Sequence, residues 1–221
     1  MSTVTIEDVK NHKLVSGLIE AANEYLGAIG YTEHGFRHAS MVSGVSQNIL
    51  QQLNYREPLT KLAAIAGYLH DIGNVINRND HGRSSAMIAL KIMEELGCDP
   101  MEIAYVVSAI GNHEEHTGEP INPVAAAMIL ADKSDVHQTR VRNPRMVAFD
   151  IHDRVNYAAE RSFLKVDEQN KTITLELTIN TEISQVMEYF EIFLDRMIMC
   201  RRAASFLHCV FELVINEKKI V

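Results

Sequence analysis

The stretch Leu62–Gly73, LAAIAGYLHDIG, ends an uncharged apolar run with an imidazole beside a carboxylate. Its composition predicts a buried helix over about residues 59–73, with Gly73 placed to end that helix. Burying His70 and Asp71 at such a position is costly unless something binds both side chains. A divalent cation would compensate the carboxylate and accept the lone pair of the imidazole. A metal site of this kind requires further ligands on other helices.

Other polar residues lie on core-facing positions of separate predicted helices. His38 is in register with a downstream apolar stripe, and His113 follows a helix whose apolar face leads to it. Asp132 ends the apolar run of residues 124–132. A lone histidine on an apolar face is more often a hydrogen-bonded core residue than a ligand. Several such residues on separate helices favour a metal held in the core of a helical bundle. The set is His38, His70, Asp71, His113 and Asp132.

This pattern resembles the HD superfamily of metal-dependent phosphohydrolases. The order is a histidine, then the His70-Asp71 pair, then an aspartate, and the segments HASMV (38–42) and ADK (131–133) are similar to the first and last ligand helices of that family. The resemblance covers roughly residues 10–160. It implies an all-helical domain with one or two metals. The first metal would be bound by His38, His70, Asp71 and Asp132.

Members of the family with two metals have additional histidines between the pair and the final aspartate. His81 and His113 match those positions, and the resemblance then implies that Asp71 bridges the two ions. The alternative for His81 is a loop residue at the N-terminus of a helix. For His113, the adjacent residues 114–116 offer competing explanations. Oxygen and imidazole ligands together favour Mn, Fe, Co, Ni or Zn over Mg or Ca.

The expected chemistry is hydrolysis of a phosphoester by metal-activated water, with Asp71 at its centre. Asp135, on the same helix face as Asp132, and Lys133 are candidate assisting groups. The residues expected to contact the substrate are histidines and arginines near the ligands, although each also fits an ordinary structural role. They are His34, His116, Arg37, Arg78 and Arg140, with Arg142 as a further source of positive charge.

The chain departs from the better-defined branches of the family. The segment after His113 lacks most of the loop typical of the cyclic-dinucleotide branch, and Asn74 stands where a lysine often follows the His-Asp pair. These departures leave the substrate open between a nucleotide and a small organic phosphate. Two alternatives to a hydrolase also stay open: a non-catalytic, metal-bound nucleotide-sensing module, and a di-iron oxygenase.

Composition sets limits on location and partners. The 221 residues are 47% hydrophobic, which is ample for a core, and the formal net charge of −8 argues against binding a nucleic-acid polymer. The three cysteines have no metal-like spacing and read as thiols in a reducing compartment. No signal-like start or membrane-length apolar run is present in the sequence. We therefore expect a cytoplasmic protein that binds no membrane.

The periodicity changes near residue 162. Upstream, helices are expected at about 5–29, 35–53, 59–73, 83–96, 100–113, 123–137 and 146–162. Downstream, alternation over 163–166 and 172–179 predicts a hairpin, followed by a helix over 183–206 and a strand over 210–215. The expected fold is mainly α: a multi-helical domain (1–160) with a small α+β subdomain (161–221) of strand, strand, helix and strand. This tail is expected either to shape a substrate pocket or to form a homodimer through an exposed strand edge.

Overall fold

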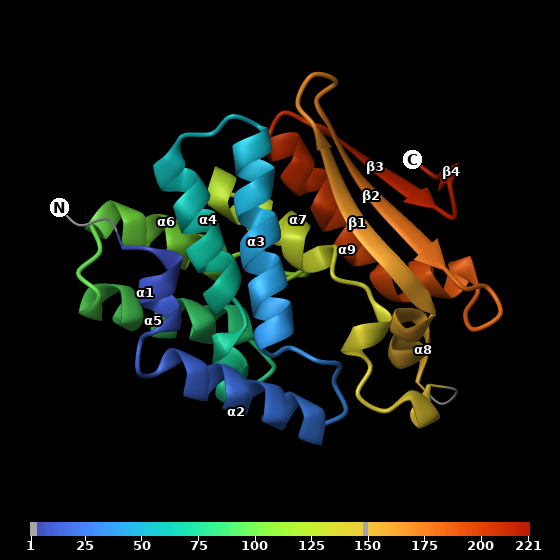
Figure 1. Cartoon of the computed structure of the whole chain (residues 1–221), viewed down its shortest axis with the longest axis horizontal. Coiled ribbons are helices and arrows are strands. Elements are labelled where there is room, and N and C mark those ends of the chain that lie inside the picture. The colour runs from blue at the N-terminus through green and yellow to red at the C-terminus, as the bar shows by residue number, and fades with distance from the viewer. Residues whose placement is uncertain (1–3, 148–149) are drawn as a thin grey trace.

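The computed structural model describes residues 4–147 and 150–221. Helices of the first two thirds of the chain form a bundle, and a small sheet lies at its C-terminal side (Figure 1). The predicted mainly α fold with an α+β tail is confirmed. The bundle helices are α1 (Ile6–Lys10), α2 (Val15–Ala28), α3 (Phe36–Gln52), α4 (Glu57–Leu69), α5 (His81–Glu95), α6 (Pro100–Gly111) and α7 (Pro123–Lys133).

The C-terminal part of helix α4 lies in the middle of the bundle, which explains why residues 62–69 carry no charge. Every residue from Leu62 to Leu69 is buried, and the helix packs against α3, α6 and α7. Gly67 permits the close approach of α3, because a Cβ atom there would lie 2.9 Å from the backbone of Val42 and Ser43. This close crossing sets His38 of α3 beside His70 at the end of α4.

The prediction that Gly73 ends the α4 helix was wrong. Helix α4 ends at Leu69, and a short 3₁₀ turn, η1 (Ile72–Val75), follows it. Gly73 instead allows η1 to approach the backbone of α5 closely. Its N–H donates to the hydroxyl of Ser85 at 2.8 Å, and a Cβ would lie 2.3 Å from the backbone nitrogen of Ser85. The glycine therefore holds Asp71 and the start of α5 together.

Replacing Gly73 by Ala is expected to destabilise the protein by about 3 kcal/mol or more, because the backbone of α5 must move away. The matched control is Gly44→Ala in α3, where a Cβ would have no neighbour within 4 Å. That change is expected to be neutral or to stabilise by up to about 1 kcal/mol. Denaturant unfolding measures both. Equal stabilities for the two variants would contradict the proposed packing role of Gly73.

Several other boundaries differ from the sequence prediction. The expected helix at 5–29 is divided into α1 and α2. Between them the N–H of Leu14 donates to the ring of His12, which also contacts Glu95. The expected helices at 100–113 and 123–137 end earlier, at Gly111 and Lys133. These shifts place His113 and Asp135 in the segments that follow α6 and α7.

The expected helix at 146–162 is largely wrong. Residues 148 and 149 lie outside the described part of the chain. Helix α8 spans Ile151–Ala158 and is capped by Asp150, whose carboxylate accepts from the N–H groups of His152 and Asp153. Strand β1 begins directly afterwards, at Ala159. Asp150 thus sets the start of a separate short helix.

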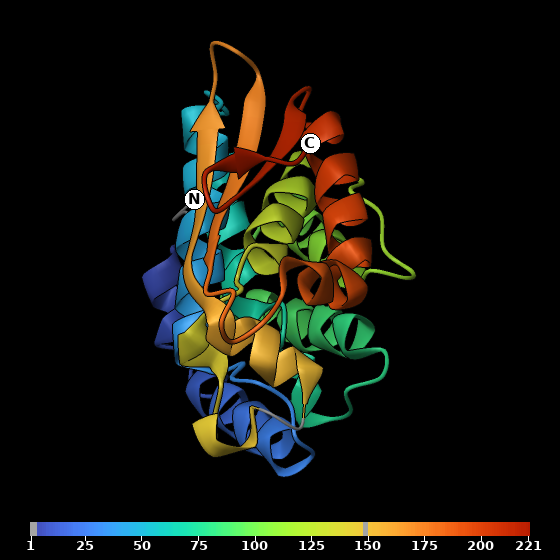
Figure 2. The same ribbon diagram turned by 90° about the vertical axis from the view of Figure 1, so that its right-hand side faces the viewer.

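The C-terminal sheet has the order β1-β2-β3-β4. Its strands are β1 (Ala159–Asp167), β2 (Thr172–Ile179), β3 (Val210–Ile215) and the short β4 (Lys218–Lys219), which was not predicted. β1 and β2 form an antiparallel hairpin, and α9 (Val186–Phe206) connects β2 to the parallel strand β3. Helix α9 packs against both the sheet and α7 (Figure 2), so one hydrophobic core runs from the bundle into the tail. Within the described ranges, no helix has the length and apolar character needed to cross a membrane.

Candidate metal centre

The side chains predicted as metal ligands converge from separate elements. His38 comes from α3, His70 and Asp71 from the end of α4, and Asp132 from α7. The remaining ligands, His81 and His113, come from the first residue of α5 and from the segment after α6. All but Asp132 are buried, and Asp132 is only slightly exposed.

One cluster has the spacing of a metal site. The Nε2 atoms of His38 and His70 are 3.2 Å apart. Asp71 Oδ2 lies 3.6 and 3.5 Å from these two nitrogens, and Asp132 Oδ1 lies 3.4 and 3.6 Å from them. Ligand atoms about 2.0–2.1 Å from an ion in tetrahedral coordination are about 3.3–3.4 Å apart. These four side chains are therefore spaced to hold one divalent ion.

A second cluster shares Asp71 with the first. Its other oxygen, Oδ1, lies 3.2 Å from His81 Nε2 and 4.0 Å from His113 Nε2. The two histidine nitrogens are 3.0 Å apart. The two oxygens of Asp71 thus face different pairs of histidines, as a bridging carboxylate would.

The outer nitrogens of the four imidazoles orient them as ligands. His38 Nδ1 lies 2.6 Å from Asp135 Oδ2, and the other three Nδ1 atoms lie near backbone carbonyls. These are Gly67 O for His70 (2.9 Å), Arg78 O for His81 (3.1 Å) and Ile110 O for His113 (2.7 Å). In the tautomer that donates Nδ1–H outward to these acceptors, each Nε2 would direct a lone pair inward. Two facing lone pairs cannot hydrogen-bond to each other, but both can bind a cation.

Electrostatics keep the carboxylates ionised and His113 neutral. Burial alone would raise the pKa of Asp71, but the charge of His70 and the hydrogen bond of His81 hold it well below its usual range. The same balance holds the pKa of Asp132 low, with Lys133 as its main stabilising neighbour. Burial and the neighbouring His81 and Lys133 lower the pKa of His113 to about 3. Ionised carboxylates and a neutral His113 are the forms that metal ligands take. Although burial opposes it, Asp71 and Asp132 raise the pKa of His70, and a bound cation would displace the proton from this ring.

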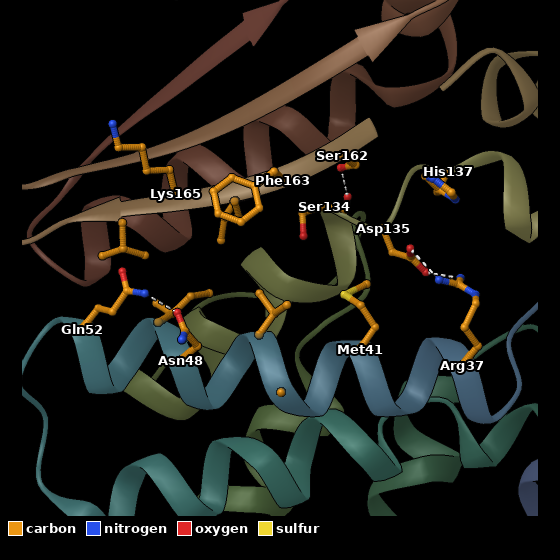
Figure 3. Close-up of a pocket in the computed structure, with 15 residues that line it drawn as sticks. Arg37, Met41, Asn48, Gln52, Ser134, Asp135, His137, Ser162, Phe163 and Lys165 are labelled. Atoms are coloured by element: carbon orange, nitrogen blue, oxygen red, sulfur yellow. Dashed lines mark hydrogen bonds and ion pairs between the residues drawn. The ribbon is translucent and has the colours of Figure 1, made fainter. Parts of the chain in front are cut away.

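Asp135 lies behind His38, on the Nδ1 side of the ring. Its carboxylate accepts two hydrogen bonds from Arg37, at 3.2 and 2.7 Å, and lies 3.6 Å from Arg140 Nε. Arg37 and Asp135 form one end of a groove of about 750 Å³ between α3 and β1 (Figure 3). The structure therefore places Asp135 where it orients a ligand, and places Arg37 beside Asp135 instead of beside the metal clusters.

Lys133 supports Asp132 from the other side. Its buried ammonium lies 2.6 Å from Asp132 Oδ2 and 3.1 Å from Glu115 Oε1. Glu115 also pairs with Arg196 of α9 at 3.3 Å. Neither Glu115 nor Arg196 was predicted. Glu115 had a weak signal in its closeness to His113, whereas nothing in the sequence connects the tail residue Arg196 to this site.

A cleft of about 470 Å³ adjoins the clusters and contains most of the predicted substrate-binding residues. Arg78 Nη1 lies 3.3 Å from His81 Nε2, and its guanidinium stacks over Tyr31. The centroid of the His34 ring lies 5.3 Å from that of the His38 ring. The wall that carries Arg78 and His34 therefore lies directly against the candidate ligands.

The other residues predicted to bind substrate contact residues of the protein itself. Both ring nitrogens of His34 are used, by the carbonyl of Thr32 and by Arg140. Arg140 is buried and donates to the backbone carbonyls of Glu33 and Asp135. His116 is exposed at the rim of the cleft, 3.8 Å from Asp195. Arg142 donates to backbone and side-chain oxygens of residues 23–32. Among the arginines predicted to bind substrate, Arg78 is the one that contacts a candidate metal ligand.

Comparisons with known proteins identify the family of this chain. Residues 35–136 match the family model of the HD domain. The chain is 30% identical over 207 residues to the uncharacterized protein MJ1020 of Methanocaldococcus jannaschii, which covers 82% of this chain and 79% of that protein. It is also similar to the crystal structure of a "predicted HD superfamily hydrolase" from an uncultured Thermotogales bacterium, with a TM-score of 0.45 and 20% identity over 61% of this chain and 75% of that one. The chain belongs to the HD superfamily. HD domains bind divalent metals, and the His/Asp clusters of this chain are suited to that role.

Proposed function

We propose that this protein is a metal-dependent phosphohydrolase acting on a nucleotide or a small organic phosphate. The observation that carries the proposal is the pair of clusters that share Asp71, beside a cleft that presents Arg78. Membership of the HD superfamily supports a metal-dependent hydrolase, and the arginine next to the clusters supports a phosphate as the group attacked.

The roles of the side chains follow from their contacts. Bound divalent ions would polarise a phosphoryl oxygen and lower the pKa of a water molecule. Asp71 holds both clusters in a fixed relation, since each of its oxygens faces one of them. Asp135 holds the Nδ1 proton of His38 and so keeps Nε2 available. Lys133 neutralises and orients Asp132, while Arg78 binds the phosphate oxygens.

Replacing Arg78 by Ala is expected to raise the KM for a phosphomonoester by about tenfold or more, because a charge-assisted contact to the phosphate is lost. Metal content should not change, since Arg78 is outside the proposed ligand set. Steady-state kinetics of the metal-loaded protein measures the effect. The control is Arg83→Ala, an exposed arginine of α5 that pairs only loosely with Asp80. An unchanged KM in the Arg78 variant would remove this residue from the substrate site.

The proposal as a whole is tested by metal analysis followed by a substrate panel. The protein is stripped with a chelator, reloaded with Mn, and incubated with phosphomonoesters and phosphodiesters. We expect hydrolysis that depends on the metal. Metal-loaded protein that binds nucleotides and releases neither phosphate nor mononucleotide would support the sensing module instead. A mixed-valent iron pair in electron paramagnetic resonance of the protein as purified, before chelation, would support the oxygenase.

A further inference from the structure

The cleft beside the candidate metal centre has two walls of different charge. The wall next to the metal ligands presents Arg78. The opposing elements, α8 and α9, contribute the carboxylates of Asp150, Asp153 and Asp195. These two helices lie outside residues 35–136, so the acidic wall is a feature of this chain in addition to its HD domain.

The cations near the acidic wall are already occupied. Arg196 of α9 pairs with Glu115, and Arg140 is buried and bound to backbone carbonyls. Arg142, whose charge acts on Asp153, donates to the carbonyls of Asn23 and Tyr31. Asp195 lies 3.8 Å from His116, and Asp150 caps α8 and lies 3.6 Å from the ring of His152. This wall therefore presents mainly acceptors to whatever occupies the cleft.

An unpartnered buried acceptor lies in the same wall. Asn156 of α8 lines the cleft and is only 4% exposed. Its Nδ2 donates to the carbonyl of His152 at 2.8 Å, whereas Oδ1 is a buried atom without a hydrogen-bond partner in the described part of the chain. A buried acceptor without a partner is destabilising, and a donor supplied by a ligand would offset that loss. Asp153, one turn before Asn156, also lines the cleft.

We propose that the substrate is a zwitterionic organic phosphate, with its phosphate toward Arg78 and a cationic amino group bound by Asp153, Asp195 and Asn156 Oδ1. This inference rests on the proposed function, and it specifies the class of substrate. A phosphate ester without a positive charge would be repelled by the carboxylates of α8 and α9. An amino group at the other end of the molecule turns this repulsion into attraction. It also supplies the N–H donors that Asn156 Oδ1 requires.

The state of Asp153 agrees with such a ligand. Burial and the neighbouring carboxylate of Asp150 raise the pKa of Asp153 above its usual value. A bound cation would stabilise the ionised form of this carboxyl and offset both effects.

The test uses three matched series of alkyl phosphates that differ only in the terminal group: amino, hydroxyl or carboxylate. Each series spans several chain lengths, so that one member reaches from the metal centre to α8. We expect kcat/KM at the best length to follow the order amino, hydroxyl, carboxylate, with about tenfold or more between the first two. Calorimetry on the metal-loaded protein measures the same order as Kd, which tests the inference even without turnover.

Two variants test whether the preference for the amino series depends on the acidic wall. Asp153→Asn and Asn156→Leu are each expected to reduce the preference for the amino series by about threefold to tenfold. Glu94→Gln, which removes an exposed carboxylate of α5, should leave the preference unchanged. Metal-dependent release of phosphate from any member of the three series reports the phosphohydrolase activity by itself. Its absence from every member of all three series would refute the proposed function. Equal kcat/KM and Kd values across the three series would overturn the inference about the amino group.

Discussion

Replacing Asp71 by Ala is expected to remove metal from both clusters and to lower phosphohydrolase activity by a factor on the order of 10³ or more. The reason is the shared position of this carboxylate. Its Oδ2 lies 3.5–3.6 Å from the histidines of the first cluster, and its Oδ1 lies 3.2 Å from His81 of the second. Each oxygen of Asp71 faces one cluster, so losing this carboxylate weakens both.

Metal content and activity of purified variants measure this effect. Asp71→Asn keeps the shape of the side chain but removes the charge, so it should lose activity nearly as fully as the alanine variant. Asp167→Asn, at the end of β1 and far from the clusters along the chain, is the control and should retain both metal and activity. Full activity in the Asp71→Ala protein would contradict the proposed metal mechanism.

Replacing Asp135 by Ala is expected to act on both stability and metal binding. Asp135 is buried and lies against the guanidinium groups of Arg37 and Arg140, of which Arg140 is itself 2% exposed. Removing one partner of a buried ion pair costs about 3–5 kcal/mol, because the other charge remains buried. The same change releases the Nδ1–H of His38, and losing such an orienting partner typically costs about 10–100-fold in metal affinity.

The stability effect of Asp135 should depend on pH. Although burial opposes ionisation, Arg140 and His38 hold the pKa of Asp135 below its usual value in the folded protein. A carboxyl with a depressed folded pKa stabilises the protein above its unfolded pKa of about 4, and loses that effect as the pH falls further. The stability difference between the wild type and Asp135→Ala should thus be full at pH 7 and shrink in acid. Asp135→Asn, which can still accept the proton of His38, should bind metal better than the alanine variant. Metal affinity equal to the wild type in both variants would refute the orienting role.

Most of the ligands were predictable from sequence because they lie on the apolar face of a helix or at the end of an apolar run. Periodicity led to His38, His113 and Asp132, and the uncharged run before them led to His70 and Asp71. His81 was expected only from the family resemblance. The contacts that orient the ligands were harder to predict from the sequence. Asp135, Glu115 and Arg196 make these contacts because segments distant in the chain pack together. Sequence periodicity carries no information on such pairings.

The residues at which helices begin and end were the weaker part of the prediction. Gly73 was predicted to end a helix, but its lack of a side chain is needed for contact with α5. His12 and Asp150 divide segments that have continuous helical periodicity, because their side chains bind the local backbone. The hairpin and the third strand of the tail were correctly predicted, since alternation at period two is a strong signal. The division into domains at about residue 160 and the homodimer remain predictions.

The central claim is that divalent metal is held between His38, His70, Asp71 and Asp132, with a second ion on the far side of Asp71. Anomalous diffraction from crystals of the Mn-loaded protein tests it most directly. We expect a peak about 2.0–2.3 Å from His38 Nε2 and His70 Nε2, and a second peak beside His81 and His113, with Asp71 between them. Crystals of active, metal-loaded protein with no peak among these side chains would contradict the account.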